Sequence, residues 1–121
     1  MDRLSRIIVA DTGNHRIQVF DQYGRFLFTY GRKGTGESEF NEPFDVAISR
    51  TGHVIVADCL NGRLQFFTPN GNFVREMSLE DKMRPVAVTT DLYDNVIVAD
   101  AEQNRVVVIS MWGERSVSCS V

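Results

Sequence analysis

The sequence predicts an all-β protein built from about three copies of one four-stranded unit. The run IIVADTGNHRIQVFDQYG returns as VIVADCLNGRLQFFTPNG and again as VIVADAEQNRVVVISMWG within the 121 residues. In every copy an Asp ends a short apolar run, an Arg follows five residues later, and a Gly follows thirteen residues after the Asp. The recurring residues are Asp11, Arg16, Gly24, Asp58, Arg63, Gly71, Asp100, Arg105 and Gly113.

The spacing of these copies points to one architecture. Successive Asp residues lie 47 and 42 positions apart. A self-similar unit of roughly 40–50 residues that contains only short strands is typical of a β-propeller blade. We therefore expect a propeller segment in which each blade is an antiparallel meander.

The first unit spans residues 7–31 and contains three strands. Ile7–Ala10 is a β-branched apolar run, and His15–Phe20 alternates apolar with polar residues, so both are predicted as strands. Asp21–Gly24 forms a tight turn, because Gly can adopt a positive φ, and Arg25–Tyr30 is the third strand. Nothing before Ile7 can form a fourth, so this blade lacks its inner strand.

The second and third units, residues 44–78 and 85–121, each contain four strands. Between the first two units lies Gly31–Pro43, the longest irregular segment, rich in glycine and charge. Eleven strands and no helix are expected in all. The eight strands of these two units are Phe44–Ile48, Val54–Ala57, Arg63–Phe67, Phe73–Met77, Pro85–Thr89, Val96–Ala99, Arg105–Ile109 and Ser116–Ser120.

The meander also predicts which connections lie together. Alternate connections of an up-and-down sheet fall at the same end, so the turns between Asp and Arg share one face with the connections between units. The short hairpin turns share the opposite face. Length varies mainly in the connections, where binding groups usually reside.

Composition excludes several classes of protein. The net charge of −3 argues against binding nucleic acid or anionic membrane through bulk charge. No apolar run approaches the roughly 18 residues of a membrane span, and the N-terminus lacks the apolar core of a signal peptide. Cys59 and Cys119 fit no zinc-ligand spacing and no disulfide framework. We expect a soluble, cytoplasmic protein without cofactor or metal.

The motif VADTGNHRIQVFDQYGRFLFTYG, followed by GxxGxGxxEFNEPFDVAI, closely resembles the NHL repeat. The repeat is named after Asn, His and Leu; here Asn14-His15 is followed by Arg-Ile, and the later copies carry Asn61-Gly62 and Gln103-Asn104. The resemblance covers residues 7–120. It implies blades of a propeller that typically has six, whereas this chain holds fewer than three complete ones.

The resemblance implies a non-catalytic module that binds a protein or single-stranded RNA. NHL propellers form the C-terminal part of tripartite-motif ubiquitin ligases, so this chain is expected to select the target while a RING domain elsewhere performs the chemistry. One alternative is a fragment of the family's metal-dependent, peptide-amidating lyase. Another is a purely structural arc, completed by missing blades of the same protein or by self-association, because a closed ring needs at least about four blades.

The recurring Asp and Arg are interpreted as structural. An Arg is always charged and cannot act as a base, and an active site is rarely present in triplicate. Gly31–Gly36 lacks the Gly-Lys-Ser/Thr ending of a phosphate-binding loop. His15 and His53 fall in different classes of turn, so they are expected on opposite faces, unable to share a metal.

The candidate binding residues lie on the face that carries the long connections. Arg32 and Lys33 are adjacent cations, Phe44 begins an inner strand, Arg84 is taken to align with Phe44 in the next copy, and His15 occupies the neighbouring turn. Cations beside an exposed aromatic suit single-stranded RNA. However, Glu37, Glu39, Glu42 and Asp45 in the same region would offset the positive charge. Trp112, in a hairpin turn, is expected to pack on a neighbouring blade.

Overall fold

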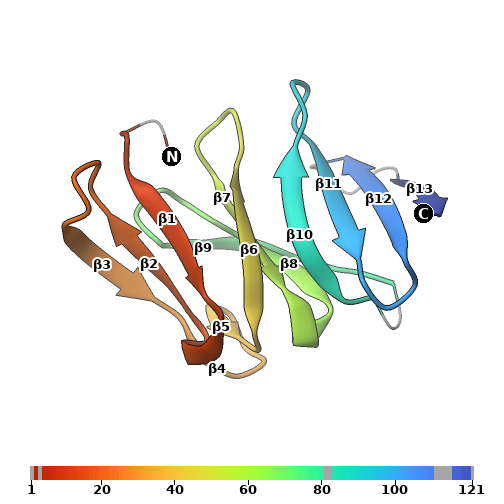
Figure 1. Cartoon of the computed structure of the whole chain (residues 1–121), viewed down its shortest axis with the longest axis horizontal. Coiled ribbons are helices and arrows are strands. Elements are labelled where there is room, and N and C mark those ends of the chain that lie inside the picture. Colours follow the sequence, from red (N-terminus) through yellow and green to blue (C-terminus); the bar gives the residue numbers. More distant parts are fainter. Residues whose placement is uncertain (1, 3, 81–82, 111–115, 121) are drawn as a thin grey trace.

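The computed structural model describes residues 2, 4–80, 83–110 and 116–120, and Figure 1 shows its chain path. The described residues form thirteen strands and two short 3-10 helices. The first fifty residues contain β1 (Ile7–Asp11), η1 (Thr12–Asn14), β2 (Arg16–Phe20), β3 (Phe26–Tyr30), β4 (Arg32–Lys33), β5 (Glu39–Phe40) and β6 (Pro43–Ile48). The remainder contains β7 (Val54–Asp58), η2 (Cys59–Asn61), β8 (Arg63–Phe67), β9 (Phe73–Ser78), β10 (Pro85–Thr90), β11 (Asn95–Asp100), β12 (Arg105–Ser110) and β13 (Ser116–Ser120).

Three antiparallel sheets lie side by side, each with its strands in sequence order (Figure 1). We call them blade 1 (β1-β2-β3), blade 2 (β6-β7-β8-β9) and blade 3 (β10-β11-β12-β13). Strand β6 lies between β1 and β10 and contacts both, so the blades are joined along their first strands. The predicted meanders are confirmed, including the three-stranded first blade.

The expected strand count was too low, because the connection after blade 1 is not irregular throughout. Its two ends fold back on each other as the short parallel pair β4 and β5, with Arg32 opposite Glu39 and Lys33 opposite Phe40. Two-residue strands carry no hydrophobic periodicity, which is why the sequence pattern does not indicate them.

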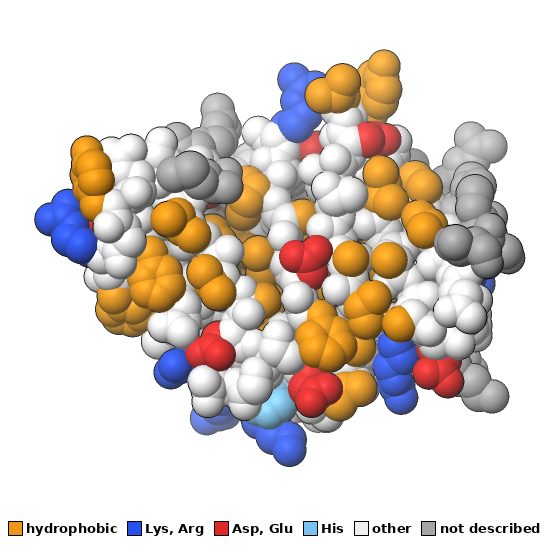
Figure 2. All heavy atoms as spheres, viewed as in Figure 1, with side chains coloured by type: hydrophobic (Ala, Val, Ile, Leu, Met, Phe, Trp, Pro, Cys, Tyr) orange, Lys and Arg blue, Asp and Glu red, His pale blue; other side chains and the backbone are white. Residues whose placement is uncertain are grey.

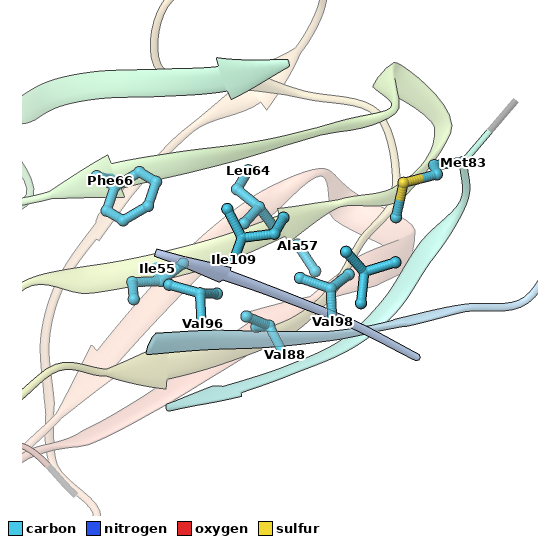
Figure 3. Close-up of a cluster of buried hydrophobic side chains, with 10 residues drawn as sticks. Ile55, Ala57, Leu64, Phe66, Met83, Val88, Val96, Val98 and Ile109 are labelled. Atoms are coloured by element: carbon cyan, nitrogen blue, oxygen red, sulfur yellow. The ribbon is translucent and has the colours of Figure 1, made fainter. Parts of the chain in front are cut away.

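Two hydrophobic clusters fill the spaces between blades. The cluster between blades 1 and 2 consists of Ile17, Phe40, Val54, Val56 and Phe67. The cluster between blades 2 and 3, drawn in Figure 3, consists of Ile55, Ala57, Leu64, Phe66, Met83, Val88, Val96, Val98, Val107 and Ile109. Alternate residues of β7 thus enter different clusters, so both faces of this strand are buried.

The outer face of blade 1 lacks such a cover. Ile7 and Val9 of β1 are 36% and 38% exposed, whereas Val54 and Val56, which occupy the same positions in blade 2, are fully buried. Full burial of a Val or Ile side chain contributes about 1.5–3 kcal/mol. Ile7 and Val9 therefore contribute less to stability than Val54 and Val56 do.

Candidate functional site: the linker face

The connections between blades and the 3-10 turns meet at one end of the sheets, the lower edge in Figure 1. We call this end the linker face. The amides of Cys59 and Leu60 in η2 donate to the carbonyls of Glu42 and Asn41, and Leu79 donates to Gly62. The expected sharing of one face by these connections is therefore confirmed.

In blade 1 the recurring Asp and Arg bond to each other. The carboxylate of Asp11 accepts hydrogen bonds from Arg16 Nε (2.8 Å), Gln18 Nε2 (2.9 Å) and Asn14 Nδ2 (3.1 Å). The hydrogen bond from Arg16, supported by that from Asn14, lowers the pKa of Asp11 below its ordinary value. A carboxylate with three donors is held as an anion and fixes the turn.

In blade 2 the equivalent residues also hold the connection to blade 1. Arg63 Nε donates to Asp58 (2.7 Å), while its terminal nitrogens donate to the carbonyls of Thr35 (2.9 Å), Gly36 (2.8 Å) and Glu39 (2.8 Å). The side chains of Arg63 and Asp58 are 9% and 0% exposed. This pair therefore works as a clamp on the backbone of a loop.

Blade 3 keeps the pair but changes its surroundings. Arg105 Nε lies 3.1 Å from Asp100 Oδ2, and Arg105 Nη2 lies 2.9 Å from Glu80 Oε2. Burial raises the pKa of Asp100, but hydrogen bonds from the Arg84 amide and the Arg105 side chain outweigh it, so the pKa lies below its ordinary value. Gly24 and Gly71 take positive φ values of 84° and 86° in the hairpin turns, whereas Gly113 lies outside the described residues, as does Trp112.

Arg32 and Lys33 form β4 and are both exposed. Arg32 Nε lies 2.8 Å from Glu39 Oε2, so its charge is compensated. The backbone hydrogen bond from Gly36, followed by that from the Arg32 side chain, lowers the pKa of Glu39. The expected offset of positive charge by a carboxylate of the same connection is thus seen at Arg32.

Phe44 lies at the start of β6, and the side chain of His15, the residue after η1, reaches the residue before that strand. His15 has a left-handed φ of 53°, and its Nδ1 accepts the amide hydrogen of Glu42 at 3.0 Å. Thr12 Oγ1 donates to the carbonyl of Pro43 at 2.8 Å. The register of β6 shifts between Pro43 and Asp45, which leaves Phe44 42% exposed. A β-bulge has therefore turned an aromatic ring out at this face.

The expected alignment of Arg84 with Phe44 is wrong. Pro43 pairs with Asp58 in blade 2, and Pro85 pairs with Asp100 in blade 3, so the residue equivalent to Phe44 is Val86. Arg84 instead corresponds to Glu42, and the carbonyls of both accept an amide hydrogen from the following turn. The error arose because the second connection is shorter. Arg84 still lies near Cys59, whose pKa burial raises and the Arg84 charge partly lowers.

Sequence reasoning missed Leu60, which is 41% exposed in η2. Its turn contacts both β6 and β10, so Leu60 stands between the starts of the two inner strands. A signal existed: the equivalent residues of the other turns are Gly13 and Glu102, and an apolar residue departs from that pattern.

A cavity of about 340 Å³ lies between the hairpin ends of blades 2 and 3, at the opposite face. Its lining includes His53 and Tyr93. His53 Nδ1 lies 2.8 Å from Thr51 Oγ1 in the β6–β7 turn, while His15 belongs to the linker face, so the two histidines are separated as expected. Within the described residues no group of three or more His, Cys, Asp or Glu side chains is placed to hold a metal ion.

Charges of both signs are mixed on the visible surface. In Figure 2, Asp and Glu side chains alternate with Lys and Arg along the lower edge, around an apolar patch, and no large basic area appears in this view. In the described part of the chain no helix is long and apolar enough to cross a membrane.

The repeated antiparallel blades, each with an Asp–Arg ion pair across the same turn, define a β-propeller segment. The chain belongs to the six-bladed β-propeller family, whose sequence pattern matches residues 2–108. It is 38% identical over 109 residues to Protein brain tumor of Drosophila melanogaster, covering 88% of this chain and 10% of that protein. It is 36% identical over 118 residues to the B-box type zinc finger protein ncl-1 of Caenorhabditis elegans, covering 94% of this chain and 14% of that protein.

These relatives are NHL-repeat proteins, which confirms the resemblance seen in the motifs. The chain thus spans a small part of each. Among solved structures, a streptogramin B lyase superposes with a TM-score of 0.78 at 16% identity, covering 98% of this chain and 38% of that one. Identity this low shows a shared fold alone.

Proposed function

We propose that this chain is a non-catalytic interaction module that binds a protein segment at the linker face. The observation that carries the proposal is the β-bulge that exposes Phe44. The exposed Leu60 belongs to a turn that is hydrogen-bonded to Asn41 and Glu42, just before Phe44, and His15 and Asp58 hold the same segment. Rigid exposed apolar side chains within a polar rim are typical of protein-binding surfaces. We call Phe44, Leu60, His15 and Arg84 the linker-face patch.

A protein ligand is favoured over single-stranded RNA by the charges around the patch. RNA binding draws most of its affinity from cations that neutralise phosphates. Arg32 is already paired with Glu39, and Glu42 and Asp45 flank Phe44. A surface with both signs of charge suits a polypeptide that also carries both.

We further propose that the chain selects the target for a larger protein of the tripartite-motif type, acting in the cytoplasm, with any ubiquitin-ligase chemistry in another domain. Support comes from the NHL-type relatives, one of which is named for a B-box zinc finger. Fold similarity to a lyase gives no matching support for catalysis, because it extends only to the fold.

The linker-face patch can be tested with peptides selected from a random library displayed on phage. We expect a selected peptide to lose about tenfold or more in affinity for F44A, because truncation of a central aromatic anchor removes about 2 kcal/mol or more of binding. Binding is measured by fluorescence anisotropy. Tyr93→Ala is the matched control, since Tyr93 is 86% exposed on the opposite face. The affinity of the Tyr93→Ala variant for the selected peptide is expected to equal that of the wild type.

A labelled oligouridylate is measured in parallel against wild type, F44A and R32E. Saturable RNA binding that both substitutions weaken, with no selected peptide sensitive to F44A, would assign the patch to RNA. Peptide affinity equal in wild type and F44A would contradict a binding role for Phe44.

A further inference from the structure

The hairpin ends of blades 2 and 3, at the upper edge in Figure 1, enclose the cavity of about 340 Å³. Phe66 is the most buried of its described lining residues and lies at one end of the cluster in Figure 3. The Arg75 guanidinium stacks 4.3 Å above the centre of the Phe66 ring, and Val74 and Tyr93 complete much of the wall. Mainly apolar cavities of this size with a few polar groups are the usual sites for small ligands.

The equivalent place between blades 1 and 2 is filled by the chain itself. Arg6 corresponds to His53, because the strands that follow them, β1 and β7, have the same register against the next strand. Phe28 corresponds likewise to Arg75. The Arg6 guanidinium lies 5.7 Å from the centre of the Phe28 ring, and its Nη2 donates to the carbonyl of Pro69 at 2.8 Å. His53 makes no such bridge, so the space between blades 2 and 3 stays open.

Hydrogen bonds in the β6–β7 turn fix the tautomer of His53. Ser49 Oγ accepts the His53 amide hydrogen (3.0 Å) and lies 3.0 Å from Thr51 Oγ1, which lies 2.8 Å from His53 Nδ1. Ser49 is 2% exposed, and among the described residues Thr51 Oγ1 is the acceptor for its hydroxyl hydrogen. The Thr51 hydroxyl therefore donates to Nδ1, and the neutral ring carries its hydrogen on Nε2. His53 thus offers a donor to the cavity that it lines.

Asn95 offers an acceptor from the other blade. Its Nδ2 donates to Asp91 Oδ2 at 2.9 Å, and this bond fixes the orientation of the side-chain amide, because a carboxylate needs a donor. Oδ1 therefore points away from Asp91, and no donor to it is found within the described part of the chain. Asn95 and His53 line the same cavity, which thus presents one donor and one acceptor within a mainly apolar wall.

The charges around the cavity favour a neutral ligand. Arg75 places a guanidinium in the wall, which disfavours a cation. The β10–β11 turn contributes the carboxylates of Asp91 and Asp94, which disfavour an anion. The hydrogen bond from the Asn95 side chain lowers the pKa of Asp91, so this carboxyl group stays charged at neutral pH.

We propose that this cavity is a binding site for a small neutral aromatic amide. The aromatic ring would lie between Phe66 and Tyr93, the amide carbonyl would accept from His53 Nε2, and the amide N–H would donate to Asn95 Oδ1. One amide group supplies both hydrogen-bonding partners, while the ring fills the apolar remainder. The site shares no residue with the linker-face patch, so it does not depend on the function proposed above.

The probe is naphthalenecarboxamide, titrated against the full chain and followed by the NMR shifts of the backbone amides in the two turns that border the cavity. We expect saturable shifts there. His53→Phe should weaken binding about tenfold, because Phe keeps a ring but leaves the ligand carbonyl without its donor. The matching carboxylate, naphthalenecarboxylate, should bind at least about tenfold more weakly than the amide, because it lacks the N–H donor and adds a negative charge.

Val74→Trp should abolish binding, because the indole would fill the space that the ligand needs. Leu27→Trp is the matched control, since Leu27 has the same bulge position in blade 1 and is 45% exposed, against 43% for Val74. Circular dichroism checks that each variant is folded. The proposal is overturned if no saturable shift appears up to the solubility limit, or if the carboxylate binds as tightly as the amide. Wild-type affinity in His53→Phe or in Val74→Trp would overturn it as well.

Discussion

Replacing Arg63 with alanine is expected to lower the free energy of unfolding by about 3–5 kcal/mol. The substitution leaves the Asp58 carboxylate, 0% exposed, without its charged partner. It also removes the donors to the carbonyls of Thr35, Gly36 and Glu39. Urea unfolding followed by circular dichroism measures the loss, provided that the slope with denaturant stays the same.

Arg16→Ala provides the control for that experiment. Arg16 occupies the same position in blade 1 and makes the same bond to its Asp, but its side chain is 40% exposed and holds no segment. Exposed ion pairs contribute little, so the loss should be a small part of that seen for Arg63. Equal losses in the two variants would contradict the role of Arg63 and Asp58 as a clamp on the loop that precedes β6.

Phe40→Ala is expected to cost about 3–5 kcal/mol, as truncation of a fully buried aromatic usually does. Phe40 is the side chain by which the segment between blades enters the cluster of Ile17, Val54, Val56 and Phe67. Its ring lies 5.7 Å from that of Phe67, centroid to centroid, and closely contacts Gly31. Removing it opens a cavity where blades 1 and 2 meet.

The matched variant is Phe44→Ala, four residues further along the chain. Because Phe44 is 42% exposed, its truncation should change the free energy of unfolding by less than about 1 kcal/mol. The same urea titration compares both. A large loss for Phe44 would mean that its ring supports the core, and the loss of peptide binding in F44A could then be a folding effect.

The repeat made the blades predictable from the sequence. Copies of one pattern share their strand order, and the positions of Asp11, Asp58 and Asp100 fix the end of the same strand in each copy. The structural role of the Asp–Arg pairs could also be predicted from the residues. Arg keeps its positive charge at all relevant pH values and cannot act as a base, and five residues separate it from an Asp across a short turn, so the two side chains were expected to pair.

The role of the connection between blades 1 and 2 could not be predicted. Arg63 reaches carbonyls that lie 24–28 residues earlier in the chain, and no local periodicity encodes such contacts. Glycine and charge suggested an irregular loop, whereas the segment is held from both ends and packs a buried Phe40. For the same reason the sequence indicated that nearby carboxylates would offset Arg32 but did not identify Glu39 as its partner.

The candidate site was predicted only in outline. His15 is tied by a hydrogen bond to Glu42, just before the bulge in β6 that exposes Phe44, and this tertiary arrangement is not encoded by any local pattern. Arg84 was aligned two residues away from the true equivalent of Phe44, and the pairings of Pro43 with Asp58 and of Pro85 with Asp100 correct the register.

Amide hydrogen exchange within the segment 34–41 tests most directly whether the recurring Asp and Arg form a backbone clamp. The amides of Ser38 and Asn41 donate to Gln65 and Asp58, whereas for the amide of Glu37, the residue before Ser38, no acceptor is found among the described residues. If the clamp holds, Ser38 and Asn41 exchange slowly, at rates close to those of β7 and β8, while Glu37 exchanges fast. Fast exchange at all three amides would show an unrestrained loop and contradict the clamp.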